Sequence, residues 1–102
     1  MALRKLGVVK TIVEAVGMDI GHVWDDLVFL NHTGLILQFT DREDTMRIHR
    51  NHEGEQSVLE RAINLLKETA RLYAMTFADG EDFLLSQADD ETLHLEFLGD
   101  RG

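Results

Sequence analysis

The amino-acid sequence predicts an α+β fold whose sheet is mostly antiparallel, with the elements in the order α-β-β-β-α-β-β. Two helical patterns, over 3–16 and 57–77, and several short alternating segments between turn residues support this prediction. The chain has 102 residues, a length that supports one hydrophobic core. We therefore expect a single domain spanning residues 1–102.

The first helix is predicted by apolar residues that share one side of a helical wheel, with charged residues opposite. Gly17 follows this pattern and is typical of a residue that ends a helix. Because β-branched residues lower helix propensity, a strand over 7–13 stays open as the alternative. The apolar residues are Leu6, Val9, Ile12, Val13 and Val16.

Short strands separated by turns follow the first helix. Gly17 and Gly21 indicate a loop over 18–23. Turns at 31–34 and 41–44 are too short for a parallel crossover, so the strands beside them form an antiparallel meander. These strands are predicted over 27–30, 35–40 and 46–49.

The clearest pattern is the long second helix over 57–77. Ser57 and Glu60 have the spacing of a capping box, and Asp79-Gly80 supplies a stop. Its apolar residues span about 200° of the wheel, about twice what a surface helix needs. We expect one side of the helix to pack on the sheet, and the first helix or a second subunit to cover the rest. Met75 falls on the polar side of this helix.

The last two strands form a hairpin. Apolar residues over 83–85 and a clean alternation over 92–98 flank the polar residues 88–90. In the second of these strands Leu93, Leu95 and Phe97 share one face, which leaves the other face for polar side chains.

Composition excludes several classes of protein. The net charge is −9, from 19 Asp or Glu against 10 Lys or Arg, which argues against a protein that tracks nucleic-acid phosphates. The chain has no Cys, so disulfides, Cys-ligated zinc and thiol catalysis are excluded, and a reducing cytoplasm is the default location. No segment approaches the roughly 18 apolar residues of a membrane span. We expect neither a nucleic-acid nor a membrane partner.

Histidines are the candidate ligands for a divalent metal. His49 and His52 stand at a strand-to-helix junction, and His94 shares the polar face of its strand with Glu96. The four side chains could form one cluster if the third and the last predicted strands are neighbours. The alternative is a solvated sheet face with surface histidines, which we favour because the H-E-x-x-H zinc pattern is absent.

Other catalytic patterns are missing from the sequence. There is no G-x-S-x-G elbow, no G-x-G-x-x-G fingerprint and no Walker loop. The acidic runs lack the spacing of a calcium loop and are explained by turn chemistry. These observations favour a protein that is not an enzyme.

Charge is segregated along the chain. Residues 79–100 carry acidic residues and no Lys or Arg, whereas Arg4, Lys5 and Lys10 make the N-terminal segment basic. Opposite charges can orient two copies of one chain, and C2 homodimers are the commonest oligomers. An acidic, solvated hairpin is the alternative interpretation.

Two functional hypotheses follow. The first is a small acidic, non-enzymatic, protein-binding module of the cytoplasm, without a cofactor and homodimeric, with Met75 and Trp24 as interface residues. The second is a metal-binding protein or metal-dependent enzyme that uses His49, His52, His94 and Glu96.

Overall fold

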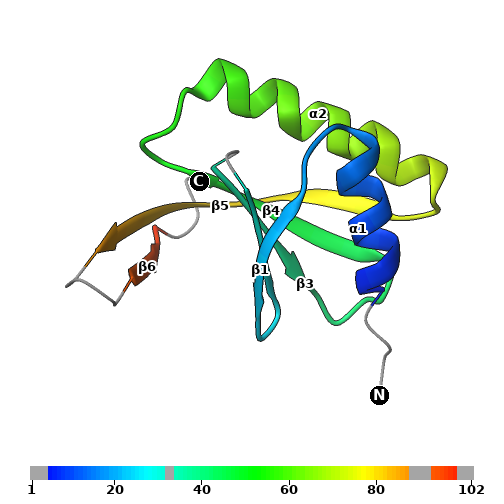
Figure 1. Cartoon of the computed structure of the whole chain (residues 1–102), viewed down its shortest axis with the longest axis horizontal. Coiled ribbons are helices and arrows are strands. Elements are labelled where there is room, and N and C mark those ends of the chain that lie inside the picture. The colour runs from blue at the N-terminus through cyan, green and yellow to red at the C-terminus, as the bar shows by residue number, and fades with distance from the viewer. Residues whose placement is uncertain (1–4, 32–33, 88–92, 99–102) are drawn as a thin grey trace.

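The part of the chain that the structure describes folds into two helices and one six-stranded sheet (Figure 1). The computed structural model describes residues 5–31, 34–87 and 93–98. The helices are α1 (Leu6–Ala15) and α2 (Gln56–Leu72), and the strands are β1 (Ile20–Trp24), β2 (Leu27–Leu30), β3 (Leu35–Phe39), β4 (Thr45–Asn51), β5 (Thr76–Gln87) and β6 (Leu93–Phe97).

The strands lie in the sheet in chain order, from β1 to β6. Every neighbouring pair is antiparallel except β4 and β5, which are parallel and are connected by α2. A parallel pair needs a crossover of a dozen or more residues, and α2 provides it. The α+β class is therefore confirmed, whereas the sheet is mixed and contains one strand more than the sequence predicts.

The main core lies between the two helices and one face of the sheet. The buried residues of α1, Val9, Ile12 and Val13, form one cluster with the buried residues of α2 and of the strands. The strand residues of this cluster are Val28, Leu30, Leu35, Leu37, Met46, Ile48 and Phe77. The apolar side predicted for the first helix is thus its buried side.

Strand β1 corrects the predicted loop over 18–23. It pairs with β2 through a tight turn at Asp25 and Asp26, where Asp25 adopts a positive φ of 57°. Gly21 lies at an irregularity in the register between Ile20 and His22. A glycine next to polar residues reads as a loop, but here it marks a β-bulge inside a strand.

The second helix is shorter than predicted. It begins at Gln56 after Glu55, without a side-chain cap, so the predicted capping box at Ser57 does not form. At its end Ala74 adopts a φ of 59°, and the Met75 N–H donates to the Ala70 carbonyl at 2.9 Å. This is a Schellman ending with alanine in the place that glycine usually takes.

Because α2 ends at Leu72, the residues that follow it lie in other positions than the sequence predicts. The predicted stop at Asp79-Gly80 lies inside β5 rather than at a helix end. Met75 is only 3% exposed and belongs to the main core, so its placement on a polar helix face was wrong. We therefore do not retain it as an interface residue.

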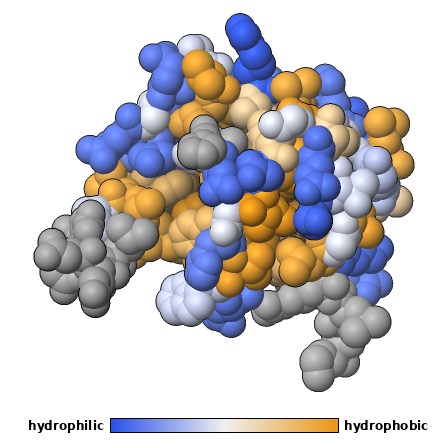
Figure 2. Space-filling model, in the orientation of Figure 1, coloured by the Kyte–Doolittle hydropathy of each residue, from blue (hydrophilic) through white to orange (hydrophobic). Residues whose placement is uncertain are grey.

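Helix α2 buries only one stripe of its wide apolar arc: Leu59, Ile63, Leu66 and Ala70. Val58, Leu65 and Leu72 remain 61%, 44% and 82% exposed, so α1 does not cover them. Hydrophobic patches interrupt the charged surface along the top of Figure 2, where α2 lies.

The final hairpin of β5 and β6 is present, with Leu85 opposite Leu95. Parts of two predicted turns, residues 32–33 and 88–90, lie outside the described residues, as do the acidic residues 89–91 and 100. Among the helices of the described chain, none is long and apolar enough to cross a membrane.

Candidate functional site

The face of the sheet opposite the helices carries a second apolar cluster. Leu27, Ile36 and Phe83 are its buried members. Phe29, Leu95 and Phe97 are partly buried and pack against them. Both helices contribute their buried side chains to the other cluster, so in the described part of the chain this face has no helix over it.

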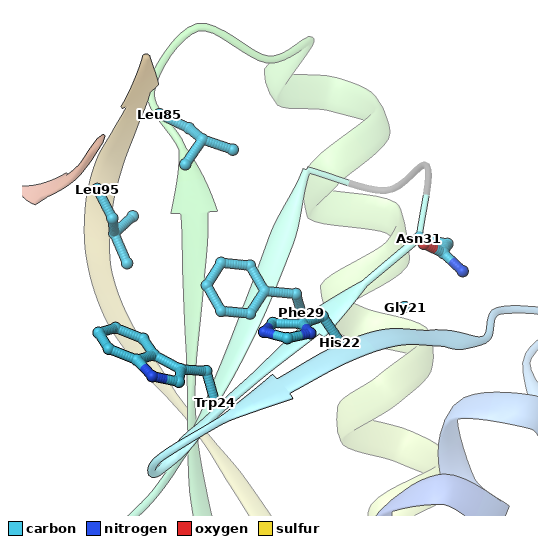
Figure 3. Close-up of a pocket in the computed structure, with 7 residues that line it drawn as sticks. All are labelled: Gly21, His22, Trp24, Phe29, Asn31, Leu85 and Leu95. Carbon is cyan, nitrogen blue, oxygen red and sulfur yellow. The ribbon is translucent and has the colours of Figure 1, made fainter. Parts of the chain in front are cut away.

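A cleft of about 510 Å³ opens on this face (Figure 3). Trp24, His22 and Phe29 approach it from β1 and β2, and Leu85 and Leu95 approach it from β5 and β6. These strands lie at the two ends of the sheet order, so the sheet must curve strongly to bring them to one cleft. Gly21 and Asn31 complete the lining.

Strand register explains why these side chains meet. Trp24 lies opposite Leu27 and His22 lies opposite Phe29, so all four side chains point to the open face. Leu85 lies opposite Leu95 in the same way across β5 and β6. Trp24 lies at the rim of the cleft and is 64% exposed.

One end of the cleft is fixed by Asn31. Its Nδ2 atom donates to Oδ2 of Asp19 at 3.0 Å, and a Cβ atom on Gly21 would overlap with the Asn31 amide. The Asn31 amide can therefore occupy this position only because residue 21 has no side chain. The rings of His22 and Phe29 lie beside each other, with centroids 6.0 Å apart.

The cleft continues into a second hollow of about 250 Å³. Phe29 and Leu85 line both spaces, so the two form one elongated groove along the open face. Asn51 and Gly34 belong to the lining of the second hollow. An elongated apolar groove suits an extended ligand better than a compact one.

A chain of hydrogen bonds lies beneath the open face. The backbone N–H of Glu81 donates to Nδ1 of His49 at 2.9 Å, so Nε2 carries the proton and donates to Oε1 of Gln38 at 2.8 Å. Gln38 in turn donates through Nε2 to Oδ2 of Asp26 at 2.9 Å. These bonds connect β5 to the turn that follows Trp24.

His49 is fully buried and both of its ring nitrogens are engaged. Its ring lies 4.6 Å from that of Phe97. Burial disfavours the charged imidazolium and lowers the pKa of His49, and the nearby Arg47 lowers it further. The imidazole is therefore neutral, and Nδ1, which would have to bind a metal, already accepts a hydrogen bond.

The predicted metal cluster does not form. Strand β5 separates β4 from β6, and His94 and Glu96 alternate with Leu95 and Phe97, so they point away from the open face where His49 lies. Among the described residues, no group of three or more His, Asp or Glu side chains is placed to hold a metal ion.

His52 instead pairs with Asp82. Its Nδ1 atom lies 3.1 Å from Oδ2 of Asp82, while Nε of Arg50 lies 3.6 Å from Oδ1 of the same carboxylate. The Asp82 side chain is only 3% exposed. An acidic run between two predicted elements suggests a turn, so sequence reasoning gave no sign of this buried carboxylate.

Sequence reasoning named only Trp24 among the residues of the cleft. It missed His22 and Asn31, because the loop predicted over 18–23 hides the alternation that directs His22 and Trp24 to one face. Comparisons with protein-family models, with curated proteins and with solved structures found no match for this chain.

Proposed function

We propose that this protein is a protein-binding module that holds an extended, basic and partly apolar segment of a partner protein in the cleft on its open sheet face. The observation that supports this most directly is an apolar cleft with Trp24, which is 64% exposed, at its rim. An exposed tryptophan beside apolar walls is typical of the residues that dominate binding energy. The interface role predicted for Trp24 thus remains part of the proposal.

Binding is favoured over catalysis by the lining of the cleft. Among the described residues that line the cleft, His22 is the one titratable side chain, and the others are apolar, glycine or amide. General acid–base chemistry needs a second group to orient or complement such a histidine. The cleft lining therefore favours binding over metal chemistry, since the described residues contain no group of three or more His, Asp or Glu side chains placed to hold a metal ion.

The form of the ligand follows from the sheet. Strand β1 stands at one end of the strand order and pairs with β2 on one side. An extended chain beside β1 could add to the sheet and direct every second side chain into the groove. The elongated groove shared by Phe29 and Leu85 offers room for these side chains.

The charge of the ligand follows from the surroundings of the cleft. Asp19 lies at the Asn31 end and Asp25 follows Trp24, whereas the lining residues that the structure describes include no Lys or Arg. Arg47 is a basic residue on this face, opposite Gln38 in the β3–β4 pair, but the whole chain carries a net charge of −9. Lys or Arg side chains of the partner would meet this potential and could stack on the indole. A cytoplasmic location remains part of the proposal.

Fluorescence offers a direct test, because Trp24 is the only tryptophan of the chain. We would titrate the protein with a peptide that alternates Lys with Val and Phe, KVKFKVK, with capped termini. Two control peptides separate the contributions: EVEFEVE keeps the apolar side chains and reverses the charge, and KSKSKSK keeps the charge and removes the apolar side chains. We expect a blue shift of Trp24 emission with the first peptide and little change with the others.

Variants locate the binding site. Leu85→Glu places a charge in the wall of the cleft, and we expect it to weaken binding of KVKFKVK at least tenfold by calorimetry. Leu6→Glu is the matched control, because Leu6 is as exposed as Leu85 but lies on α1, which packs on the other face of the sheet. The proposal fails if no peptide binds at millimolar concentration, if EVEFEVE binds as well as KVKFKVK, or if both variants weaken binding equally.

A further inference from the structure

We propose that two copies of the chain associate through α2, with the two helices packed antiparallel along the stripe of Val58, Leu65 and Leu72. These side chains are 61%, 44% and 82% exposed, so the apolar surface of the stripe is open to a partner. This inference concerns the opposite face of the molecule from the cleft. It does not depend on the proposed peptide binding.

The three residues form a continuous stripe because they recur every seven positions, close to two helical turns. On a wheel of about 100° per residue, the stripe lies roughly 130° from the stripe of Leu59, Ile63, Leu66 and Ala70 that faces the core. A second helix placed on the exposed stripe would therefore approach from the side, clear of the sheet.

The spacing of the stripe is symmetric, which favours a second copy over an unrelated helix. Leu65 stands at its midpoint, with Val58 seven residues before it and Leu72 seven residues after it. A two-fold axis at Leu65 would bring Leu65 against itself and Val58 against the partner's Leu72. C2 interfaces are self-complementary in this way.

Charge complementarity supports the same arrangement. Arg61 and Glu68 lie on one edge of the stripe, and neither forms an ion pair with another described residue. In an antiparallel pair they stand at nearly the same height, Arg61 of each copy near Glu68 of the other. In a parallel pair this edge would face the partner's opposite edge, so Arg61 and Glu68 of the two copies would not meet. The opposite edge holds the small side chains Ala62 and Thr69, which permit close approach.

The size of the stripe sets the expected strength. Helix α2 has 17 residues and is about 25 Å long, so one helix pair buries less than the roughly 800 Å² per partner of a standard interface. We therefore expect a dimer that dissociates in the micromolar range and is visible by sedimentation equilibrium.

Substitution at the axis tests the interface. Leu65→Glu places two carboxylates together in the dimer, and we expect it to raise the dissociation constant at least a hundredfold while the fold, measured by circular dichroism, is kept. Asn64→Glu is the matched control, with the same new side chain one position away from the stripe. The inference is overturned if the wild-type chain is monomeric to millimolar concentration. It is also overturned if Trp24→Glu dissociates the dimer and Leu65→Glu does not, because the cleft would then hold the second copy.

Cysteine cross-linking tests the orientation, because the chain has no cysteine of its own. We expect Leu65→Cys to form a disulfide-linked dimer under mild oxidation. Val58→Cys should not do so alone, because an antiparallel pair separates the two Val58 positions by about 21 Å along the helix. A mixture of Val58→Cys and Leu72→Cys should cross-link. Self-linking of Val58→Cys as efficient as that of Leu65→Cys, or equal linking of Glu60→Cys on the far side of α2, would contradict the model of association.

Discussion

The Nε2 atom of His49 donates to Oε1 of Gln38 across 2.8 Å, and the bond from Gln38 to Asp26 extends this connection from the buried imidazole to the turn that follows Trp24. The same imidazole accepts the Glu81 N–H of β5 through Nδ1. The two walls of the cleft are therefore connected through one buried side chain. Buried networks of this kind stiffen a site when every member is satisfied, and the described residues contain no buried side-chain nitrogen or oxygen without a partner.

The titration of His49 predicts how stability depends on pH. Because burial lowers its pKa from the usual 6.5, the unfolded chain takes up a proton at a higher pH than the folded protein does. Its contribution to the free energy of unfolding is complete above pH 6.5 and decreases as the pH falls through the lowered pKa. Arg47, Glu81 and Asp26 are the charged groups that act on it.

We expect urea denaturation between pH 5 and pH 8 to show this decrease in the wild type and a weaker one in His49→Phe. The variant also leaves the Glu81 N–H and the Gln38 carbonyl without their partner, so it should cost about 1–3 kcal/mol at pH 8. His94→Gln is the control, because His94 is exposed, and it should keep the wild-type dependence. An unchanged pH dependence in His49→Phe would show that another group causes it.

Gly80 should not tolerate a side chain. A Cβ atom at this position would lie 2.8 Å from the Ile48 carbonyl oxygen and 2.6 Å from Nδ1 of His49. We expect Gly80→Ala to lower the free energy of unfolding by about 1–3 kcal/mol, because the backbone of the β4–β5 pair must shift. Gly7→Ala is the matched control: among the described residues beyond its own helical turn and chain neighbours, no heavy atom lies within 4 Å of the added Cβ, and alanine favours the helix by up to about 1 kcal/mol. Thermal unfolding compares the two, and equal effects would refute the close approach.

Replacing Ala74 with glycine should stabilise the protein. Its φ of 59° is the left-handed conformation at the end of α2, which costs an L residue roughly 1 kcal/mol or more. We expect Ala74→Gly to raise the free energy of unfolding by about 0.5–1 kcal/mol, despite the added freedom of the unfolded chain. Chemical denaturation measures the change. A loss of stability would mean that α2 continues through residue 74.

Met75 and Leu72 are three residues apart but should respond oppositely to a charge. Met75 is 3% exposed in the core, so Met75→Glu should cost at least about 3 kcal/mol or prevent folding. Leu72 is 82% exposed, and Leu72→Glu should leave the stability of the monomer within about 0.5 kcal/mol. Circular dichroism at a low protein concentration separates the two. A folded, stable Met75→Glu variant would show that residue 75 is exposed, as the longer helix predicted from the sequence requires.

The sequence predicts the elements whose periodicity and end signals agree. The end of α1 is an example, because Gly17 takes the positive φ of 83° that its position suggests. The strands β2, β3 and β4 and the final hairpin are also found near their predicted positions. In each of these cases, alternation and turn residues indicate the same boundary.

The errors arise where a residue does something unusual for its type. Alanine at position 74 ends α2 without the glycine signal, so the helical pattern runs on to Phe77 in the sequence. Gly21 marks a bulge in a strand rather than a loop, and Gly80 allows a close approach of two strands rather than a helix stop. The cleft could not be predicted, because it depends on the curvature that brings β1 near β5 and β6.

The binding proposal is tested most directly by nuclear magnetic resonance of the labelled protein titrated with the KVKFKVK peptide. We expect shift changes for the Trp24 indole N–H and for backbone amides of β1, β2, the second half of β5 and β6, while α2 is unaffected. Shift changes confined to α2, or no changes at millimolar peptide, would contradict the proposal that the open face of the sheet is the binding site.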